Sequence, residues 1–214
     1  MTAYTKRLQK VTAVLCTTAL LAGCAAGTSD STEPAATTAQ VKAITIEPTA
    51  AYQTMNGFGA SACWWSQEVG NWENAKDILS LLYDENSGIG LNIYRYNLGA
   101  GSKDDATITD LDRRAEAFID KDGSYHWERD AAAQNALALA RSMNEDLRVT
   151  LFSNSAPVFY TANGKAYCDY LPDEENYVTN LEPERYADFA KYSIACAKHF
   201  TEAGYRVTGL SPIN

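Results

Sequence analysis

Residues 207–214 read Val-Thr-Gly-Leu-Ser-Pro-Ile-Asn, an apolar run that ends in a polar side chain. The run has the β-branched and apolar composition of a strand. In a barrel of parallel strands, the side chains at the carboxyl ends of the strands gather at one mouth, where active sites form. We therefore expect Asn214 to lie at a functional site.

Upstream of this strand, helical and strand patterns alternate. Each helical pattern places apolar side chains at spacings of three and four residues and follows a residue suited to a helix start. The predicted helices begin after Asn71 or Asn74, after Asp130 and at Pro183, and the predicted strands cover 57–62, 91–98, 147–152 and 207–213. This repeat of strand and helix indicates parallel βα units.

The alternation leaves two folds open, a doubly wound sheet and a (β/α)8 barrel. The doubly wound dinucleotide-binding fold is disfavoured because Gly57-Phe58-Gly59 lacks the third glycine of the Gly-x-Gly-x-x-Gly pattern. A complete barrel takes about 250 residues, whereas residues 43–214 supply four strands. We therefore predict an α/β fold, the N-terminal half of a (β/α)8 TIM barrel, with 43–214 forming a partial domain truncated after the fourth strand. A complete small α/β protein is the alternative.

The N-terminus has the order of a secretory signal. Three basic residues precede a mostly apolar run over 11–22, which is shorter than the ~20 residues that span a bilayer as a helix. Leu21-Ala22-Gly23-Cys24 follows and resembles the lipobox of bacterial lipoproteins, in which the cysteine is acylated. The sequence predicts a lipoprotein signal peptide over 1–23, lipidation at Cys24, a flexible tether over 24–42 and export to the bacterial cell surface. An ordinary signal peptide is the alternative.

The chain is acidic, with 27 Asp and Glu against 18 Lys and Arg and a formal net charge of −9. Removal of the signal would take away three of the basic residues and none of the acidic ones. This balance argues against nucleic acid and anionic polymers, because both bind clustered Lys and Arg. Neutral small molecules or neutral glycans are better ligands.

Cysteine and histidine indicate no metal or cofactor site. Beyond Cys24, the thiols are Cys63, Cys168 and Cys196, an odd count without a zinc spacing, so their disulfide state stays open. Cys196 is interpreted as a buried free thiol. The two histidines belong to no metal or triad spacing, and no Gly-x-Ser-x-Gly elbow indicates serine hydrolysis.

The predicted carboxyl ends of the strands carry aromatic rings, amides and one arginine. Sugars need such a set, because their apolar C–H faces pack on Trp and Tyr while their hydroxyls need fixed donors and acceptors. Core packing is the alternative for either tryptophan. The predicted substrate-binding residues are Trp64, Trp65, Arg95, Asn97, Asn154, Phe159, Tyr160 and Asn214.

The strand over 91–98 alternates between two faces of its sheet. Tyr94 and Tyr96 are expected on one face, and Arg95 and Asn97 on the other. An inward Arg95 needs a carboxylate partner, because an unpaired buried charge is costly. An outward Arg95 would be a solvated salt-bridge donor.

Four motifs occur in chain order. They are Gly57-Phe58-Gly59-Ala60-Ser61 followed by Trp64-Trp65, then Tyr94-Arg95-Tyr96-Asn97-Leu98-Gly99, Ser153-Asn154-Ser155-Ala156-Pro157 and Leu210-Ser211-Pro212-Ile213-Asn214. Together they resemble glycoside hydrolase family 30, most closely its endo-β-1,6-galactanase-like members, over 41–214. The sequence departs from the pattern at Ala156, where Pro is common, and at Tyr160, where Met is expected. The long polar segment 102–129 matches no part of it, and a segment of that kind is usually functional or mobile.

The resemblance implies a retaining O-glycoside hydrolase whose (β/α)8 barrel carries a β-sandwich, with strands near Ile44 and Tyr52 contributing to the sandwich. It places the acid/base glutamate directly after Asn214 and the nucleophile at the end of the seventh strand. No catalytic carboxylate is therefore expected within this N-terminal fragment. Asn214 would bind the sugar 2-hydroxyl, and Arg95 would lie beside the nucleophile and help to keep it ionised.

The predicted function is hydrolysis of a neutral β-linked glycan by the full-length parent, most closely as an endo-β-1,6-galactanase, with the 214-residue fragment inactive alone. A glucosylceramidase-like or xylanase-like hydrolase of the same family is one alternative. A non-catalytic glycan-binding surface lipoprotein is another. The predicted partners are a polysaccharide or glycoside and, through Cys24, the membrane, with no nucleic acid, metal or cofactor.

Overall fold

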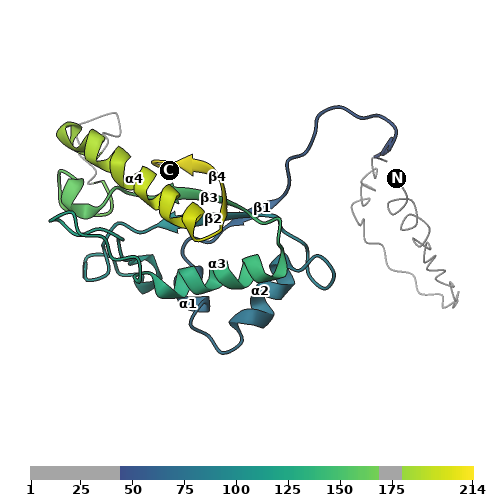
Figure 1. Cartoon of the computed structure of the whole chain (residues 1–214), viewed down its shortest axis with the longest axis horizontal. Helices are drawn as coiled ribbons and strands as arrows, with labels where there is room; N and C mark the ends of the chain where they lie inside the picture. The colour runs from purple at the N-terminus through teal and green to yellow at the C-terminus, as the bar shows by residue number, and fades with distance from the viewer. Residues whose placement is uncertain (1–43, 169–179) are drawn as a thin grey trace, which may run out of the picture. The chain divides into compact units, whose positions relative to one another are not determined.

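The computed structural model of the protein describes residues 44–168 and 180–214 (Figure 1). The predicted signal peptide over 1–23, the predicted tether over 24–42 and Cys24 lie outside the described residues. The chain divides into two units, 1–51 and 52–214, and every helix and strand named below belongs to the second.

The second unit is built on a four-stranded sheet in which all neighbouring strands are parallel. The order in the sheet follows the order in the chain, so each strand pairs with the next one along the sequence. The strands are β1 (Gly59–Ser61), β2 (Ile93–Leu98), β3 (Arg148–Ser153) and β4 (Arg206–Ser211). The predicted parallel α/β fold is confirmed, and each predicted strand of the βα repeat overlaps an observed one.

Helices occupy the connections between these strands. The connections contain α1 (Ser66–Val69) and α2 (Ala75–Tyr83), then α3 (Ala131–Met143), then α4 (Tyr186–Glu202), with short 3-10 turns η1 (Leu111–Arg113), η2 (Val158–Tyr160) and η3 (Pro183–Arg185). Within residues 44–168 and 180–214, no helix has both the length and the apolar character that crossing a bilayer requires.

The predicted helix starts are close to the observed ones, but their side chains do not cap. Pro183 opens the 3-10 turn that leads directly into α4. Asn74 and Asp130 precede α2 and α3, and neither side chain bonds to the first turn of its helix. The carboxylate of Asp130 instead accepts a hydrogen bond of 2.6 Å from the hydroxyl of Tyr96.

The core lies between the sheet and its helices. Tyr94 packs against Tyr83 of α2 with ring centroids 5.5 Å apart, and Tyr96 packs against Phe200 of α4 at 4.9 Å. The hydroxyl of Tyr96 also reaches Asp130 at the start of α3. Tyr94 and Tyr96 point to the same side of β2, so α2, α3 and α4 all cover one face of the sheet.

One covered face and consecutive strand order distinguish this sheet from a doubly wound one, which has helices on both faces. A strand, crossover helix and neighbouring parallel strand repeated with one hand give the arrangement of a (β/α) barrel wall. In Figure 1, α2 and α3 run side by side along the sheet, and α4 leads into β4.

Two strands predicted near the N-terminus are absent from the described residues. Residues 44–46 and 52–55 form no β-ladder, and Ile44 and Tyr52 are 87% and 91% exposed. A strand needs a neighbouring strand for its backbone hydrogen bonds. The described residues provide no such neighbour for either segment.

Candidate active site

The uncovered face of the sheet carries polar side chains that meet where the strands end. Arg95 and Asn97 project from β2 on the side opposite Tyr94 and Tyr96, as strand alternation predicts. Asn154 follows β3 directly, and Asn214 follows β4. The backbone N–H of Asn214 donates to the carbonyl of Ser153 over 2.9 Å, which holds the segment after β4 against the end of β3.

Arg95 is held by an amide and an aromatic ring. Its Nη2 donates to Oδ1 of Asn214 over 2.6 Å, and its guanidinium carbon lies 3.4 Å from the ring centroid of Phe152. The ion pairs found among the described residues do not include Arg95, so the carboxylate partner predicted for it is absent from this part of the chain. The arginine faces the site with a charge that a carboxylate can neutralise.

Asn154 connects the ends of all four strands. Its Nδ2 donates to Sγ of Cys63 over 2.8 Å and to Oδ1 of Asn97 over 3.3 Å. Its Oδ1 accepts from Nδ2 of Asn214 over 3.2 Å. Burial raises the pKa of the Cys63 thiol to about 11, so Cys63 is a neutral thiol at physiological pH.

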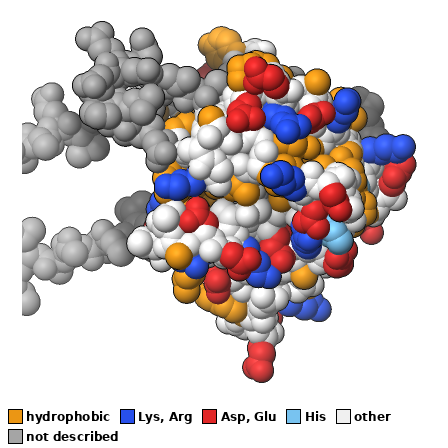
Figure 2. Space-filling view, turned by 90° about the vertical axis from the view of Figure 1, so that its left-hand side faces the viewer, with side chains coloured by type: hydrophobic (Ala, Val, Ile, Leu, Met, Phe, Trp, Pro, Cys, Tyr) orange, Lys and Arg blue, Asp and Glu red, His pale blue; other side chains and the backbone are white. Residues whose placement is uncertain are grey.

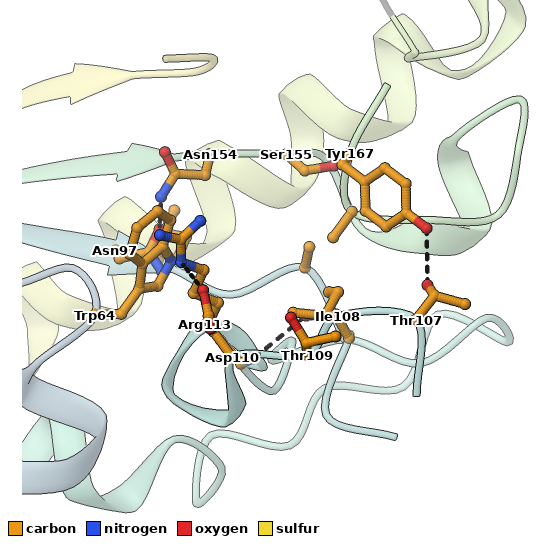
Figure 3. Close-up of a pocket in the computed structure, with 15 residues that line it drawn as sticks. Trp64, Asn97, Thr107, Ile108, Thr109, Asp110, Arg113, Asn154, Ser155 and Tyr167 are labelled. Atoms are coloured by element: carbon orange, nitrogen blue, oxygen red, sulfur yellow. Dashed lines mark hydrogen bonds and ion pairs between the residues drawn. The ribbon is translucent and has the colours of Figure 1, made fainter. Parts of the chain in front are cut away.

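A pocket of about 320 Å³ opens beside this network (Figure 3). One part of its lining comes from the strand ends and includes Trp64, Asn97 and Asn154. Another part comes from the polar segment 102–129, and Tyr167 from the loop after β3 completes it. The mixture of ring surface, amides and hydroxyls suits a ligand with apolar faces and many hydroxyl groups.

The segment 102–129 places a charged pair beside the ring of Trp64, one of the predicted substrate-binding residues. The guanidinium carbon of Arg113 lies 4.7 Å from the ring centroid of Trp64, and Nε of Arg113 is 3.1 Å from a carboxylate oxygen of Asp110. Arg113 therefore covers one face of the Trp64 ring, and the carboxylate of Asp110 partly neutralises the charge of Arg113. Figure 3 shows Asp110 and Arg113 beside Trp64 in the pocket wall.

A second hollow, of about 310 Å³, adjoins the first. Asn154, Ser155, Ala166 and Tyr167 line both, and Asn214 lines the second. Where the two meet, the hydroxyls of Tyr167 and Thr107 lie 2.8 Å apart and link the loop after β3 to the loop after β2 (Figure 3). The two hollows share this part of their walls.

Ion pairs order the base of the 102–129 segment. Arg129 binds both carboxylate oxygens of Asp120, at 2.7 and 3.0 Å, and Lys103 binds Glu116 at 2.7 Å. The hydrogen bonds from Arg129 hold the pKa of Asp120 below its usual range. Glu116 also accepts from the backbone N–H of Asp130 over 2.8 Å. The segment is thereby fixed to the start of α3.

Three predicted site residues lie away both from the two hollows and from the hydrogen-bonded group at the strand ends. Trp65 packs against the core and donates from Nε1 to the carbonyl of Ser61 over 2.8 Å, which matches the core-packing alternative. Phe159 lines a separate, more charged hollow of about 640 Å³. Tyr160 is buried against Phe159, with ring centroids 4.6 Å apart.

The structure also brings in residues that the sequence did not assign to the site. Thr107, Asp110 and Arg113 line the pocket from the 102–129 segment, and Cys63 contacts Asn154. The length and polarity of the segment indicated a functional role, but no periodicity showed which of its side chains turn inward. Cys63 gave no signal other than its position after the first strand.

The charges around the site are mixed. Figure 2 looks onto the side of the molecule where the strands end and shows acidic and basic side chains interspersed with apolar ones. Within the described residues, no group of three His, Cys, Asp or Glu side chains is arranged to hold a metal ion. The geometry fits recognition of a neutral, hydroxyl-rich ligand by hydrogen bonds and ring contacts.

Residues 41–214 match the sequence profile described as O-glycosyl hydrolase family 30. An endo-β-1,6-galactanase from Hypocrea rufa is 28% identical over 180 residues, which cover 73% of this chain and 36% of that protein. The chain thus spans little more than a third of the length of this relative.

Solved structures give the same picture of the fold. A conserved exported protein from Bacteroides fragilis superposes with a TM-score of 0.66 at 29% identity, over 77% of this chain and 35% of that one. The endo-β-1,6-glucanase BT3312 superposes with a TM-score of 0.53 at 16% identity, over 76% of this chain and 36% of that one. The second similarity concerns the fold alone.

Proposed function

The chain belongs to glycoside hydrolase family 30, and from this membership we propose that the full-length protein is a retaining glycosidase. Its substrate is a neutral β-linked glycan, and its specificity is closest to that of an endo-β-1,6-galactanase. The complete protein forms the whole (β/α)8 barrel with an attached β-sandwich. The 214-residue segment is inactive alone.

One observation carries the proposal. Arg95, Asn97, Asn154 and Asn214 form a hydrogen-bonded group at the carboxyl edge of a parallel sheet, beside a pocket that Trp64 helps to line. In barrels of this kind the reaction takes place at that edge. The group offers donors and acceptors for sugar hydroxyls, and the ring offers an apolar surface for a sugar face.

Retaining hydrolysis needs two carboxyl groups about 5 Å apart, one that attacks the anomeric carbon and one that protonates the leaving oxygen. We place the acid/base on a glutamate that follows Asn214 and the nucleophile on a glutamate from a later strand. Arg95 favours the ionised nucleophile through its charge. This role is supported by the absence of any carboxylate within salt-bridge distance of Arg95 among the described residues.

Asn214 binds the substrate in this scheme. Its Oδ1 is taken by Arg95, and one hydrogen of its Nδ2 is directed to Asn154. An amide nitrogen carries two hydrogens, so the second can be donated to the 2-hydroxyl of the sugar. A hydrogen bond to that hydroxyl strengthens in the transition state of glycoside hydrolysis.

The substrate assignment rests on the related galactanase from Hypocrea rufa. A glucosylceramidase-like or xylanase-like specificity is the alternative within the family. The similarity to an exported protein from Bacteroides fragilis supports export of this protein, and anchoring through a lipid on Cys24 at the bacterial surface completes the proposal.

The test is an assay of the full-length protein on β-1,6-galactan, β-1,6-glucan, xylan and aryl β-glucosides. We expect hydrolysis of β-1,6-galactan with retention of the anomeric configuration, and no turnover by residues 1–214 alone. Hydrolysis of xylan alone would reject the galactanase specificity. Binding of a glycan without turnover by the full-length protein would identify a non-catalytic glycan-binding lipoprotein instead.

A further inference from the structure

The amide of Asn154 has only one orientation that satisfies its neighbours. Its nitrogen faces two acceptors, Sγ of Cys63 at 2.8 Å and Oδ1 of Asn97 at 3.3 Å, while its oxygen faces the Nδ2 of Asn214 at 3.2 Å. Rotation of the amide by half a turn would oppose oxygen to oxygen at Asn97 and nitrogen to nitrogen at Asn214. The two acceptors on the first strands favour this orientation of Asn154, and the guanidinium of Arg95, which can only donate, favours the matching orientation of Asn214.

The hydrogen bonds run in one direction across the sheet. Arg95 donates to Asn214, Asn214 donates to Asn154, and Asn154 donates to Asn97 and Cys63. Asn214 and Asn154 each accept a bond at the amide oxygen and donate from the amide nitrogen, an arrangement in which neighbouring bonds polarise one another. At the acceptor end, Asn97 is 4% exposed and Cys63 is half-buried.

We propose that Cys63 and Asn97 are positioning residues that act through Asn154 to orient the side chain of Asn214 toward the substrate. This inference rests on the proposed function, which makes Asn214 the residue that contacts the sugar. Cys63 lies after β1 and Asn97 within β2, so the ends of the first strands control a group that follows the fourth. Neither residue needs to touch the reacting atoms.

Cys63 fits this role as a hydrogen-bond acceptor and not as a nucleophile. The thiol is half-buried and neutral, because burial raises its pKa to about 11. A thiolate is the reactive form of cysteine, so reaction at this position is suppressed. What remains is a sulfur atom that accepts a weak hydrogen bond from Asn154.

The experiment compares three variants of the full-length protein. Cys63→Val removes the acceptor with little change in volume, and Cys63→Ser keeps an acceptor at the same place. Cys196→Val is the control, because Cys196 is also a free thiol but is buried on α4, on the helix side of the sheet. Thermal unfolding of each variant establishes that it is folded.

The substrates are an aryl glycoside of β-1,6-galactobiose and its analogue without the 2-hydroxyl on the reacting sugar. We expect Cys63→Val to lower kcat about tenfold with KM changed less than about twofold, which corresponds to loss of one hydrogen bond in the transition state. Cys63→Ser and Cys196→Val are expected to stay within about threefold of the wild type. With the 2-deoxy substrate the loss in Cys63→Val should disappear, because Asn214 then has no hydroxyl to meet.

Equal losses on both substrates, or unchanged kcat in Cys63→Val, would overturn the proposal. A purely structural role for Cys63 would not distinguish the two sugars. Asn97→Leu, which removes the other acceptor, provides a second variant with the same expected pattern if Cys63→Val does not fold.

We call the hydrogen-bonded path from Cys63 and Asn97 through Asn154 to Asn214 the relay. A crystal structure of each full-length variant tests the relay without reference to activity. We expect the amide of Asn154 to turn away from Asn214 in Cys63→Val and to keep its orientation in Cys63→Ser. An unchanged Asn154 in Cys63→Val would reject the relay. Absence of any glycosidase activity in the wild type would instead reject the proposed function, and the crystal structures would still decide on the relay.

Discussion

Asp130 is a carboxyl group buried on the helix side of the sheet, where it is 5% exposed. Burial raises its pKa to about 7, with a smaller opposing effect from the Tyr96 hydroxyl that donates to it over 2.6 Å. The carboxylate of Glu116 accepts from the backbone N–H of Asp130, and its nearby negative charge also raises the pKa of Asp130. At neutral pH the side chain of Asp130 is therefore partly protonated in the folded protein.

The consequence for stability has a definite sign. The pKa of Asp130 in the folded protein, about 7, lies above the ~3.9 of an aspartate in an unfolded chain, so the folded state binds the proton more tightly. The free energy of unfolding should fall as the pH rises from about 4 to about 7 and then level off.

Replacement of Asp130 by Asn tests whether Asp130 causes this pH dependence of stability. The amide keeps an acceptor oxygen for Tyr96 but cannot ionise, so we expect Asp130→Asn to gain on the order of 1–3 kcal/mol over the wild type at pH 8 and almost nothing at pH 4. Urea unfolding at both pH values measures the difference. Asp77→Asn, the same substitution on the exposed side of α2, is the matched control for the chemical change. A gain in Asp130→Asn that is equal at both pH values would contradict the assignment.

At the scale of the element, the first strand depends on a glycine. The strand predicted over 57–62 includes Gly59, where an added Cβ would lie 2.4 Å from the carbonyl oxygen of Ile93 in β2, so the two backbones pack closely there. Gly209 in β4 is less restricted, because its added Cβ would meet the side chain of Thr150 at 3.0 Å.

These two glycines make a matched pair. Gly59→Ala must move the backbone of β1 or β2, and we expect a loss of about 2–4 kcal/mol in the free energy of unfolding. Gly209→Ala displaces a side chain only, and its loss should stay below about 1 kcal/mol. Chemical denaturation of both variants checks the order, and equal losses would show that the β1 and β2 backbones do not approach as closely as described.

The loops after β2 and β3 form another unit at this scale, joined where the hydroxyls of Tyr167 and Thr107 meet at 2.8 Å. Tyr167→Phe and Thr107→Val each break this link. In the full-length protein we expect each to raise KM for the polysaccharide about two- to fivefold and the double variant to add little more, because both remove the same interaction. Steady-state kinetics of the double-mutant cycle tests this, and additive effects would mean that the two hydroxyls act separately.

For the whole molecule, the arrangement of the sheet follows from local patterns. The alternation of β-rich runs and helical stripes depends on residues that are close in the sequence. The positions of Asn154 and Asn214 directly after their strands depend on such residues too. The network between them follows from parallel strands that end at one edge. These features could therefore be predicted from the sequence.

The pocket wall could not be predicted in the same way. Thr107 and Tyr167 lie 60 positions apart, and their contact depends on the path of two irregular loops. The adjacent residues Trp64 and Trp65 occupy different environments: Trp64 lines the pocket, and Trp65 packs against the core. Composition cannot separate two identical residues whose directions are set by the backbone between a strand and a short helix.

The proposed lipid anchor at Cys24 leads to a prediction for the whole protein. If Cys24 carries a lipid, Cys24→Ser in the full-length protein should move it from the membrane fraction to the soluble fraction and abolish incorporation of labelled fatty acid. The glycosidase activity of the released protein should be unchanged. Continued fatty-acid labelling of Cys24→Ser would place the lipid elsewhere.

The one-directional relay across the four strands also has an evolutionary consequence. Every nitrogen and oxygen that links Asn97, Asn154 and Asn214 already has a defined partner, so a substitution at one of these positions leaves an unmatched donor or acceptor at the next. A lineage that loses Asn154 is then under selection to change its neighbours as well. Among homologous proteins, the residues at the positions of Cys63, Asn97, Asn154 and Asn214 should covary as a set. The residue found at position 63, after the first strand, should predict the residue found at position 154, after the third.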